Sequence, residues 1–198
     1  MKNSSEFRAL ARAQLKPRLW WVVLVVFIVA ALPSASAVAA VGFVLAGPLL
    51  VGQSYYLLDI IENDAKGDRL EWLFEGFKKS FLNSFLAWLV SSIFVFLWSL
   101  LFIIPGIIKA LAYSMAPYII SEEPNIDALA AIQKSQDMMK GNKMRLFSLY
   151  LSFIGWFILC IFTFGIGFIF LMPYVQMSVA NFYLDIRGKK VVVAQIVE

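Results

Sequence analysis

The sequence contains no histidine and only one cysteine among its 198 residues. Histidine is the commonest acid–base group of catalysis and the commonest metal ligand. The lone cysteine, Cys160, lies between apolar neighbours, cannot form an intramolecular disulfide and is expected to pack as a small apolar side chain. We therefore expect no metal, no cofactor and no catalytic residue, and we expect that the protein is not an enzyme.

Charge is also scarce. Only 15% of the residues are charged and 61% are hydrophobic, whereas a soluble domain has about 25% charged and about 45–50% apolar residues. Residues 19–58 and 146–184 carry no charge, and residues 80–121 carry only Lys109. One crossing of a bilayer takes about 20 apolar residues, so each stretch can cross twice. The predicted fold class is an all-α polytopic membrane bundle, with six transmembrane helices in three hairpins and additional amphipathic interfacial helices.

Glycine, proline or small polar residues lie near the middle of each stretch and mark the predicted turns. The predicted hairpins pair residues 19–33 with 38–60, residues 81–103 with 106–121 around Ile104-Pro105-Gly106, and residues 146–163 with 167–186 around Gly165-Ile166-Gly167. Hairpins that dip into the membrane without crossing it are the alternative, but lipid-exposed irregular backbone is not tolerated in hydrocarbon.

Proline and glycine inside these arms carry further expectations. Pro48 is expected to kink its helix and Pro173 to break its helix, because proline lacks the backbone N–H that a helix needs. Gly42, Gly47 and Gly52 recur along the second arm and should permit close approach of a neighbouring helix.

The charged segments between the hairpins are predicted to form interfacial helices of one integral membrane domain, residues 1–198. Residues 3–16 predict an amphipathic helix that lies on anionic lipid, with Arg8, Arg12 and Lys16 as a basic stripe. Residues 59–79 mix charged and aromatic residues in the same way. In residues 122–145, Pro124 and Asn125 should open a helix that ends at Gly141. Its apolar side is expected to hold the residues Ile126, Leu129, Ile132 and Met139.

The distribution of basic residues sets the orientation. All 17 Lys and Arg residues except Lys109 lie in residues 1–18, 59–79, 122–145 and 187–198. Positive charge prefers the cytoplasmic side, so we expect a multi-pass protein of the cell inner (plasma) membrane with both termini in the cytoplasm. Basic residues that flank apolar stretches do not indicate nucleic-acid binding.

Ala35-Ser36-Ala37 resembles a signal-peptide cleavage site, so either cleavage there or a retained first helix is open.

Several local patterns resemble one known family. They are Ile104-Pro105-Gly106-Ile107-Ile108-Lys109, Tyr113-Ser114-Met115-Ala116-Pro117-Tyr118, Met138-Met139-Lys140-Gly141-Asn142-Lys143, Leu151-Ser152-Phe153-Ile154-Gly155-Trp156, Pro173-Tyr174 and Phe182-Tyr183, with Trp20-Trp21, Gly47-Pro48 and Phe74-Glu75-Gly76-Phe77 in the first half. The chain is similar in these patterns to the bacterial integral membrane family known as domain of unknown function 975. The resemblance implies a bacterial inner-membrane protein and supplies no catalytic residues.

Five residues form the candidate intramembrane polar site: Lys109, Tyr113, Gln53, Gln176 and Asn181. An ion inside a membrane span marks a functional site by default, so Lys109 can hold an anionic headgroup or substrate, with Tyr113 one turn further on the same face. The other interpretation is that Lys109 snorkels to the outer headgroups. The uncharged polar residues either line a solute path or bond neighbouring helices.

The leading functional prediction is a non-enzymatic accessory or scaffold protein that binds membrane lipids, or a membrane-protein partner through residues 124–141. The main alternative is a small transporter or channel for a lipid-like or amphipathic solute. A membrane enzyme that acts on lipids is a third, because acidic clusters such as Glu122-Glu123 can bind a cation or transfer protons. Solvated loop charge is the favoured explanation of these clusters, and no nucleic acid is expected as a partner.

Overall fold

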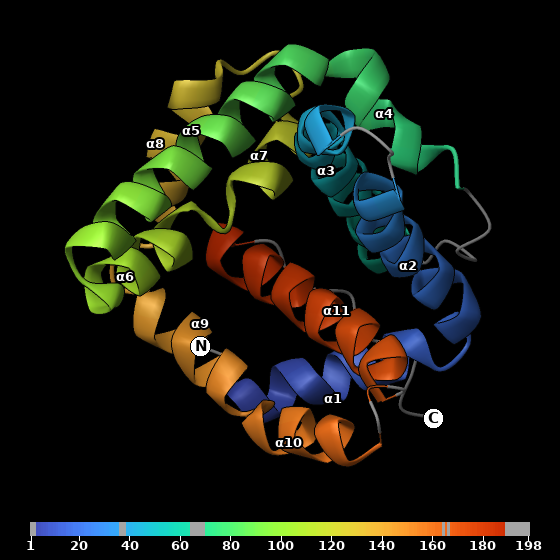
Figure 1. Ribbon diagram of the computed structural model, residues 1–198. Coiled ribbons are helices and arrows are strands. Elements are labelled where there is room, and N and C mark those ends of the chain that lie inside the picture. The colour runs from blue at the N-terminus through green and yellow to red at the C-terminus, as the bar shows by residue number, and fades with distance from the viewer. Residues whose placement is uncertain (1–2, 36–38, 64–69, 164, 166, 189–198) are drawn as a thin grey trace. The chain divides into compact units, whose positions relative to one another are not determined.

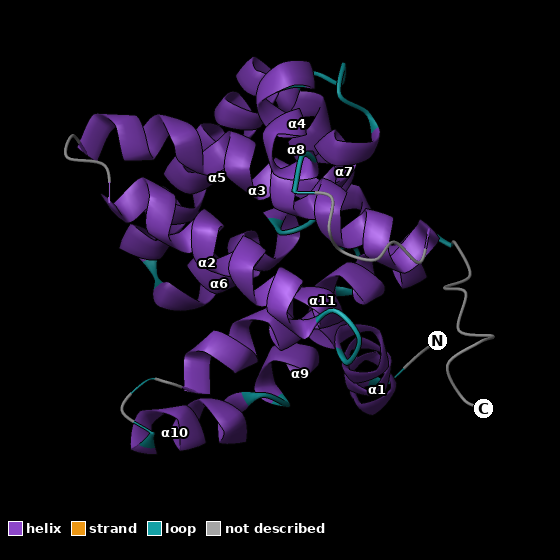
Figure 2. Ribbon diagram, turned by 90° about the vertical axis from the view of Figure 1, so that its right-hand side faces the viewer, coloured by secondary structure: helices purple, strands orange, loops and turns teal. Residues whose placement is uncertain are grey.

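The structure is a computed structural model that describes residues 3–35, 39–63, 70–163, 165 and 167–188 (Figure 1). Every regular element among these residues is an α-helix (Figure 2), which confirms the predicted all-α fold. The helices are α1 (Ser4–Leu15), α2 (Leu19–Ala35), α3 (Ala39–Asn63), α4 (Trp72–Lys79), α5 (Phe81–Leu101), α6 (Ile103–Tyr113), α7 (Ala116–Glu122), α8 (Ala128–Met138), α9 (Lys143–Leu151), α10 (Ile154–Phe162) and α11 (Gly167–Arg187).

Within the described residues, five segments are long and apolar enough to cross a membrane. They are Gly42–Asn63, Phe81–Leu100, Ile103–Glu122, Lys143–Phe162 and Gly167–Arg187. A sixth span would combine α1 with α2, whose axes meet at 104°. The five segments agree with five of the six predicted arms, whereas the arm predicted at residues 19–33 passes only in combination with α1. Ser36 and Ala37 of the cleavage-like motif and most of the final tail lie outside the described residues.

The chain divides into two compact units. The first unit comprises residues 1–28, 56–69 and 144–198, and the second comprises residues 29–55 and 70–143. The first unit therefore holds α1, α10, α11 and most of α9, and the second holds α4 to α8. α2 and α3 each contribute one part to either unit.

In the first unit, α1 packs across α11 (Figure 1). α1 begins at Asn3, whose side chain accepts a hydrogen bond from the Ser4 N–H at 2.8 Å, as the predicted amphipathic helix requires. The Phe7 ring meets the edge of Phe182 with centroids 5.5 Å apart. Phe7, Ala11 and Leu15 are buried, so the apolar side of α1 is covered by its own chain.

Pro173 does not break α11, and that prediction is wrong. The helix continues through Pro173 to Arg187, as α3 continues through Pro48. A proline removes one hydrogen bond of the helical ladder, and helices of membrane proteins tolerate this loss where neighbouring groups compensate for it.

In the second unit, glycines bring α3 against α4 and the start of α5. A Cβ atom added to Gly52 would overlap the Leu73 carbonyl oxygen, and one added to Gly76 would overlap the Pro48 carbonyl oxygen. A Cβ at Gly47 would lie 2.6 Å from the Ser84 carbonyl oxygen. The expected close approach of a helix at Gly47 and Gly52 is therefore confirmed.

The turn of the second hairpin lies earlier than predicted. α5 and α6 are separated by Phe102, whose backbone is extended with φ −157° and ψ 142°. Pro105 and Gly106, predicted as the turn, belong to the first turns of α6. Proline is tolerated there because the first N–H groups of a helix have no acceptor within the helix.

α8 begins later than predicted, and its predicted apolar side is buried at Ile132 and Met139 but not at Leu129. Asp127 caps it by accepting hydrogen bonds from Leu129 and Ala130 N–H, at 3.0 and 3.4 Å, so Pro124 and Asn125 precede the helix. Ile132 is buried as expected, but Leu129 is 62% exposed. The positive φ of 76° at Gly141 confirms the predicted stop after the helix.

The buried side of α8 is tied to the rest of the second unit. Ser135 donates to the Ala112 carbonyl at 2.7 Å and accepts from the Met115 N–H at 3.2 Å. On the exposed side, hydrogen bonds from Lys140 and then Gln133 lower the pKa of the Asp137 carboxyl. Much of the surface of the predicted partner-binding helix therefore packs against the rest of its own unit.

Candidate functional site

The five predicted polar residues belong to different units: Lys109, Tyr113 and Gln53 to the second, and Gln176 and Asn181 to the first. The Lys109 ammonium lies 5.3 Å from the centre of the Trp98 ring and 5.9 Å from the centre of the Tyr113 ring. Such contacts stabilise a cation on aromatic faces. Gln53 is buried, and its amide nitrogen has no hydrogen-bond partner among the described residues.

Asn181 bonds two helices. Its amide nitrogen donates to Gln14 Oε1 at 2.6 Å, and its Oδ1 accepts from Gln14 Nε2 at 3.3 Å. Both residues are buried, Asn181 completely and Gln14 to 5% exposure. Gln176 is half-buried on the same helix. The geometry favours the helix-bonding interpretation for Asn181, with Gln14 as a partner that the sequence did not reveal.

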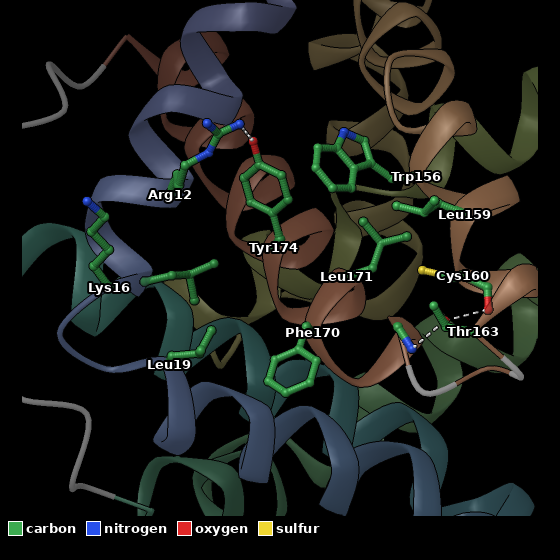
Figure 3. Close-up of a pocket in the computed structure, with 12 residues that line it drawn as sticks. Arg12, Lys16, Leu19, Trp156, Leu159, Cys160, Thr163, Phe170, Leu171 and Tyr174 are labelled. Carbon is green, nitrogen blue, oxygen red and sulfur yellow. Dashed lines mark hydrogen bonds between the residues drawn. The ribbon is translucent and has the colours of Figure 1, made fainter.

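The first unit contains a cavity of about 500 Å³ between α1, the start of α2, α10 and α11 (Figure 3). Most of the side chains that line it are apolar. The lining residues are Arg12, Leu15, Lys16, Leu19, Trp156, Leu159, Cys160, Thr163, Gly167, Phe170, Leu171 and Tyr174.

Two cations stand at one side of this cavity, Arg12 from α1 and Lys16 directly after it (Figure 3). Arg12 Nη2 lies 3.2 Å from the Tyr174 hydroxyl, and the Arg12 guanidinium carbon lies 5.7 Å from the centre of the same ring. Lys16, one helical turn later, is exposed. No carboxylate lines the cavity.

Two other basic residues of the first unit pair with carboxylates, whereas these two cations have no such partner in the described part of the chain. Arg145 pairs with Asp185 at 2.8 Å, and Arg187 pairs with Glu62 at 3.3 Å. Among the described residues, by contrast, no carboxylate pairs with Arg12 or Lys16. The cavity therefore has a positive side that the described chain does not neutralise.

The opposite side of the cavity is closed by the end of α10 and the start of α11. The Thr163 hydroxyl donates to the Cys160 carbonyl at 2.9 Å and accepts from the Gly167 N–H at 3.2 Å. A Cβ on Gly167 would lie 2.7 Å from the Cys160 sulfur. The polar groups at this side are satisfied internally, so it offers an apolar surface.

Local sequence patterns revealed only part of this site. The sequence predicts the basic stripe of Arg8, Arg12 and Lys16 and places it on a lipid surface. The cavity itself depends on the packing of α1 against helices more than 140 residues later in the chain, as in the bond from Arg8 to the Ser152 carbonyl at 3.1 Å. No periodicity or motif signals such a contact.

A second cavity, of about 260 Å³, lies within the second unit between α3, α5, α6 and α7. Hydroxyl groups line it beside small apolar residues, and they come from Ser84, Ser91, Ser92, Tyr113 and Ser114. The Ser91 hydroxyl is buried and has no hydrogen-bond partner among the described residues. Tyr113 is the one residue of the predicted polar site that borders this cavity.

Residues 100–190 match the model of the family described as "Protein of unknown function (DUF975)". Over this region the chain is similar to the DUF975 family. The predicted resemblance is thereby confirmed for slightly less than half of the 198 residues. The DUF975 region includes α10 and α11, and α1 with its two cations lies outside it. No curated protein and no solved structure matches the chain.

Proposed function

We propose that the protein is a non-enzymatic accessory protein of the bacterial inner membrane that binds a membrane lipid in the cavity of the first unit. One observation carries the proposal: an apolar cavity of about 500 Å³ has two cations at one side and satisfied polar groups at the other. Ligand pockets typically enclose roughly 300–1,000 Å³. A lipid is an amphiphile, so its polar head group would contact the cationic side and its hydrocarbon tail the apolar side.

The chemistry of the cavity supports binding rather than catalysis. It has no carboxylate, and its one hydroxyl apart from Tyr174 is bonded to main-chain groups. The titratable groups that do line the cavity are Lys16, Cys160 and Tyr174, and no carboxylate or histidine lines it to accept a proton from them. We therefore propose no reaction at this site.

Filling the cavity tests lipid binding. Leu159 lines the cavity and is 54% exposed, whereas its neighbour Ile158 is 52% exposed and does not line it. We expect Leu159→Trp to displace the bound lipid and Ile158→Trp to leave it in place. Native mass spectrometry of the three proteins released from lipid nanodiscs measures the number of retained lipids. Equal retention by wild type and both variants would contradict the proposal.

The transporter for an amphipathic solute is the second candidate, because the cavity of the second unit has an unpartnered buried hydroxyl at Ser91. Polar groups inside membrane spans often mark solute paths. The wild-type protein in sealed vesicles separates the candidates. A transporter would move a fluorescent lipid between leaflets, whereas an accessory lipid-binding protein would bind it without moving it.

Six crossings with both termini in the cytoplasm complete the proposal. Five segments, or six with the bent pair of α1 and α2, are apolar enough to cross, and the basic residues flank them. In a Cys160→Ser background, we expect an external maleimide on sealed cells to label Ala35→Cys and not Ala130→Cys. The reverse pattern would overturn this topology.

A membrane-protein partner that binds residues 124–141 stays a prediction. The exposed side of α8 around Leu129 is the part open to it, because Ala131 and Ile132 are buried within the chain. A complex that survives purification and is lost on Leu129→Glu would support such a partner, and an unchanged complex would argue against this surface.

A further inference from the structure

The cations and the apolar walls of the first cavity lie on different sides, and this separation restricts the chemistry and the orientation of a ligand. Arg12 and Lys16 stand on one side, and Cys160 and Thr163 stand on the opposite side (Figure 3). Leu159 and Leu171 also line the cavity. A ligand that fits both sides has a charged head at α1 and a hydrocarbon tail directed toward α10 and α11.

We infer that the ligand is an anionic amphiphile whose phosphate or carboxylate head is held by Arg12 and Lys16. This inference rests on the lipid binding proposed above and adds the charge and the orientation of the ligand. Residues four apart lie on the same face of a helix, so the two cations can reach one head group. Both cations are exposed and lack a carboxylate partner among the described residues, so an anionic head would gain their attraction without displacing an ion pair, whereas a zwitterionic head would bring a further positive charge to them.

Arg12 is already oriented for this task. The Tyr174 hydroxyl occupies one of its nitrogens, and the ring of Tyr174 lies under the guanidinium. An arginine has five N–H donors in a planar fork that matches the oxygens of phosphate and carboxylate. The bond to Tyr174 therefore fixes the group and leaves donors for an anion, and Lys16 adds a second charge without a carboxylate partner among the described residues.

The tail end of the cavity contains a native reporter. Cys160 is the only cysteine of the chain, lines the cavity and is 6% exposed. A ligand that lies with its tail against α10 must cover this sulfur. Its alkylation therefore reports occupancy without an engineered label.

The experiment measures alkylation of Cys160 by N-ethylmaleimide in the full-length protein, purified in a neutral maltoside detergent. Dodecyl phosphate and laurate provide anionic heads, dodecylphosphocholine provides a zwitterionic head on the same tail length, and inorganic phosphate provides a head without a tail. We expect the two anionic amphiphiles to protect Cys160 at concentrations about tenfold lower than dodecylphosphocholine, as charge-assisted hydrogen bonds predict. Inorganic phosphate is expected not to protect it.

Two variants show whether the cations cause the preference. The double variant Arg12→Gln and Lys16→Gln should lose the tenfold difference and keep protection by dodecylphosphocholine. Lys140→Gln, which removes a cation just after α8 in the second unit, should keep the preference. Thermal unfolding of each protein verifies that it is folded, and native mass spectrometry of the same mixtures counts bound amphiphile if Cys160 does not react.

The possible results separate this inference from the proposed function. Equal protection by anionic and zwitterionic amphiphiles would overturn the charge of the ligand and leave lipid binding intact. A preference that survives the double glutamine variant would also overturn the inference, because the cations would not cause it. If no amphiphile protects Cys160 and none is found bound by mass spectrometry, lipid binding itself is overturned.

Discussion

Gly52→Ala is expected to destabilise the second unit strongly. A methyl group at this position would overlap the carbonyl oxygen of Leu73 and approach the Leu73 Cα at 2.9 Å. Because the obstacle is backbone, it cannot yield by a change of rotamer, and α3 and α4 would have to separate. Overpacking costs about 1–3 kcal/mol and occasionally more, against a total stability of about 5–15 kcal/mol. Thermal unfolding and monodispersity in detergent measure the effect.

Gly155→Ala is the matched control for this substitution. Gly155 lies in α10, and a Cβ atom there would meet nothing within 4 Å. Alanine favours a helix over glycine by up to about 1 kcal/mol, so this variant should be as stable as wild type or slightly more stable. Equal behaviour of Gly52→Ala and Gly155→Ala would show that α3 and α4 are not in the close contact described above.

The sequence predicted most of the helices because their limits depend on local chemistry. Charge scarcity located the long apolar helices, Asn3 and Gly141 marked a beginning and an end, and Gly47 and Gly52 indicated a close contact. The errors are local as well. Pro105 looked like a turn, but the first turns of a helix accept proline, so the chain breaks at Phe102 instead.

The candidate site was less predictable, since it depends on contacts between distant segments. The basic stripe of α1 was visible in the sequence, but its position beside α10 and α11 was not. Nothing around Gln14 indicates that it pairs with Asn181, and nothing around Tyr174 indicates that it orients Arg12. Hydropathy and capping describe single elements, whereas a cavity between four helices requires the tertiary arrangement.

The second large effect is expected from the buried amide pair of Gln14 and Asn181. Asn181→Leu would leave the Gln14 amide buried without its partner, and an unsatisfied polar group costs about 1–3 kcal/mol. Gln14→Leu should cost a similar amount, because it leaves Asn181 with only its bond to the Met177 carbonyl at 2.9 Å. The stability of the double variant should be closer to that of wild type than the stability of either single variant, because two apolar side chains leave no buried polar group without a hydrogen bond. Thermal unfolding of the four proteins gives the coupling energy, and additive losses would contradict a direct pair.

The same cycle connects the packing of α1 with the cavity, because α1 carries both cations and forms one wall. If Asn181→Leu loosens α1 from α11, Arg12 and Lys16 lose their fixed position while their charges remain. We therefore expect the single variant to react faster at Cys160 and to lose part of its preference for dodecyl phosphate over dodecylphosphocholine. The double leucine variant restores the packing and should recover both properties. If the double leucine variant recovers its stability but not its preference for dodecyl phosphate, the amide pair itself, rather than the packing of α1 on α11, shapes the side of the cavity that holds Arg12 and Lys16.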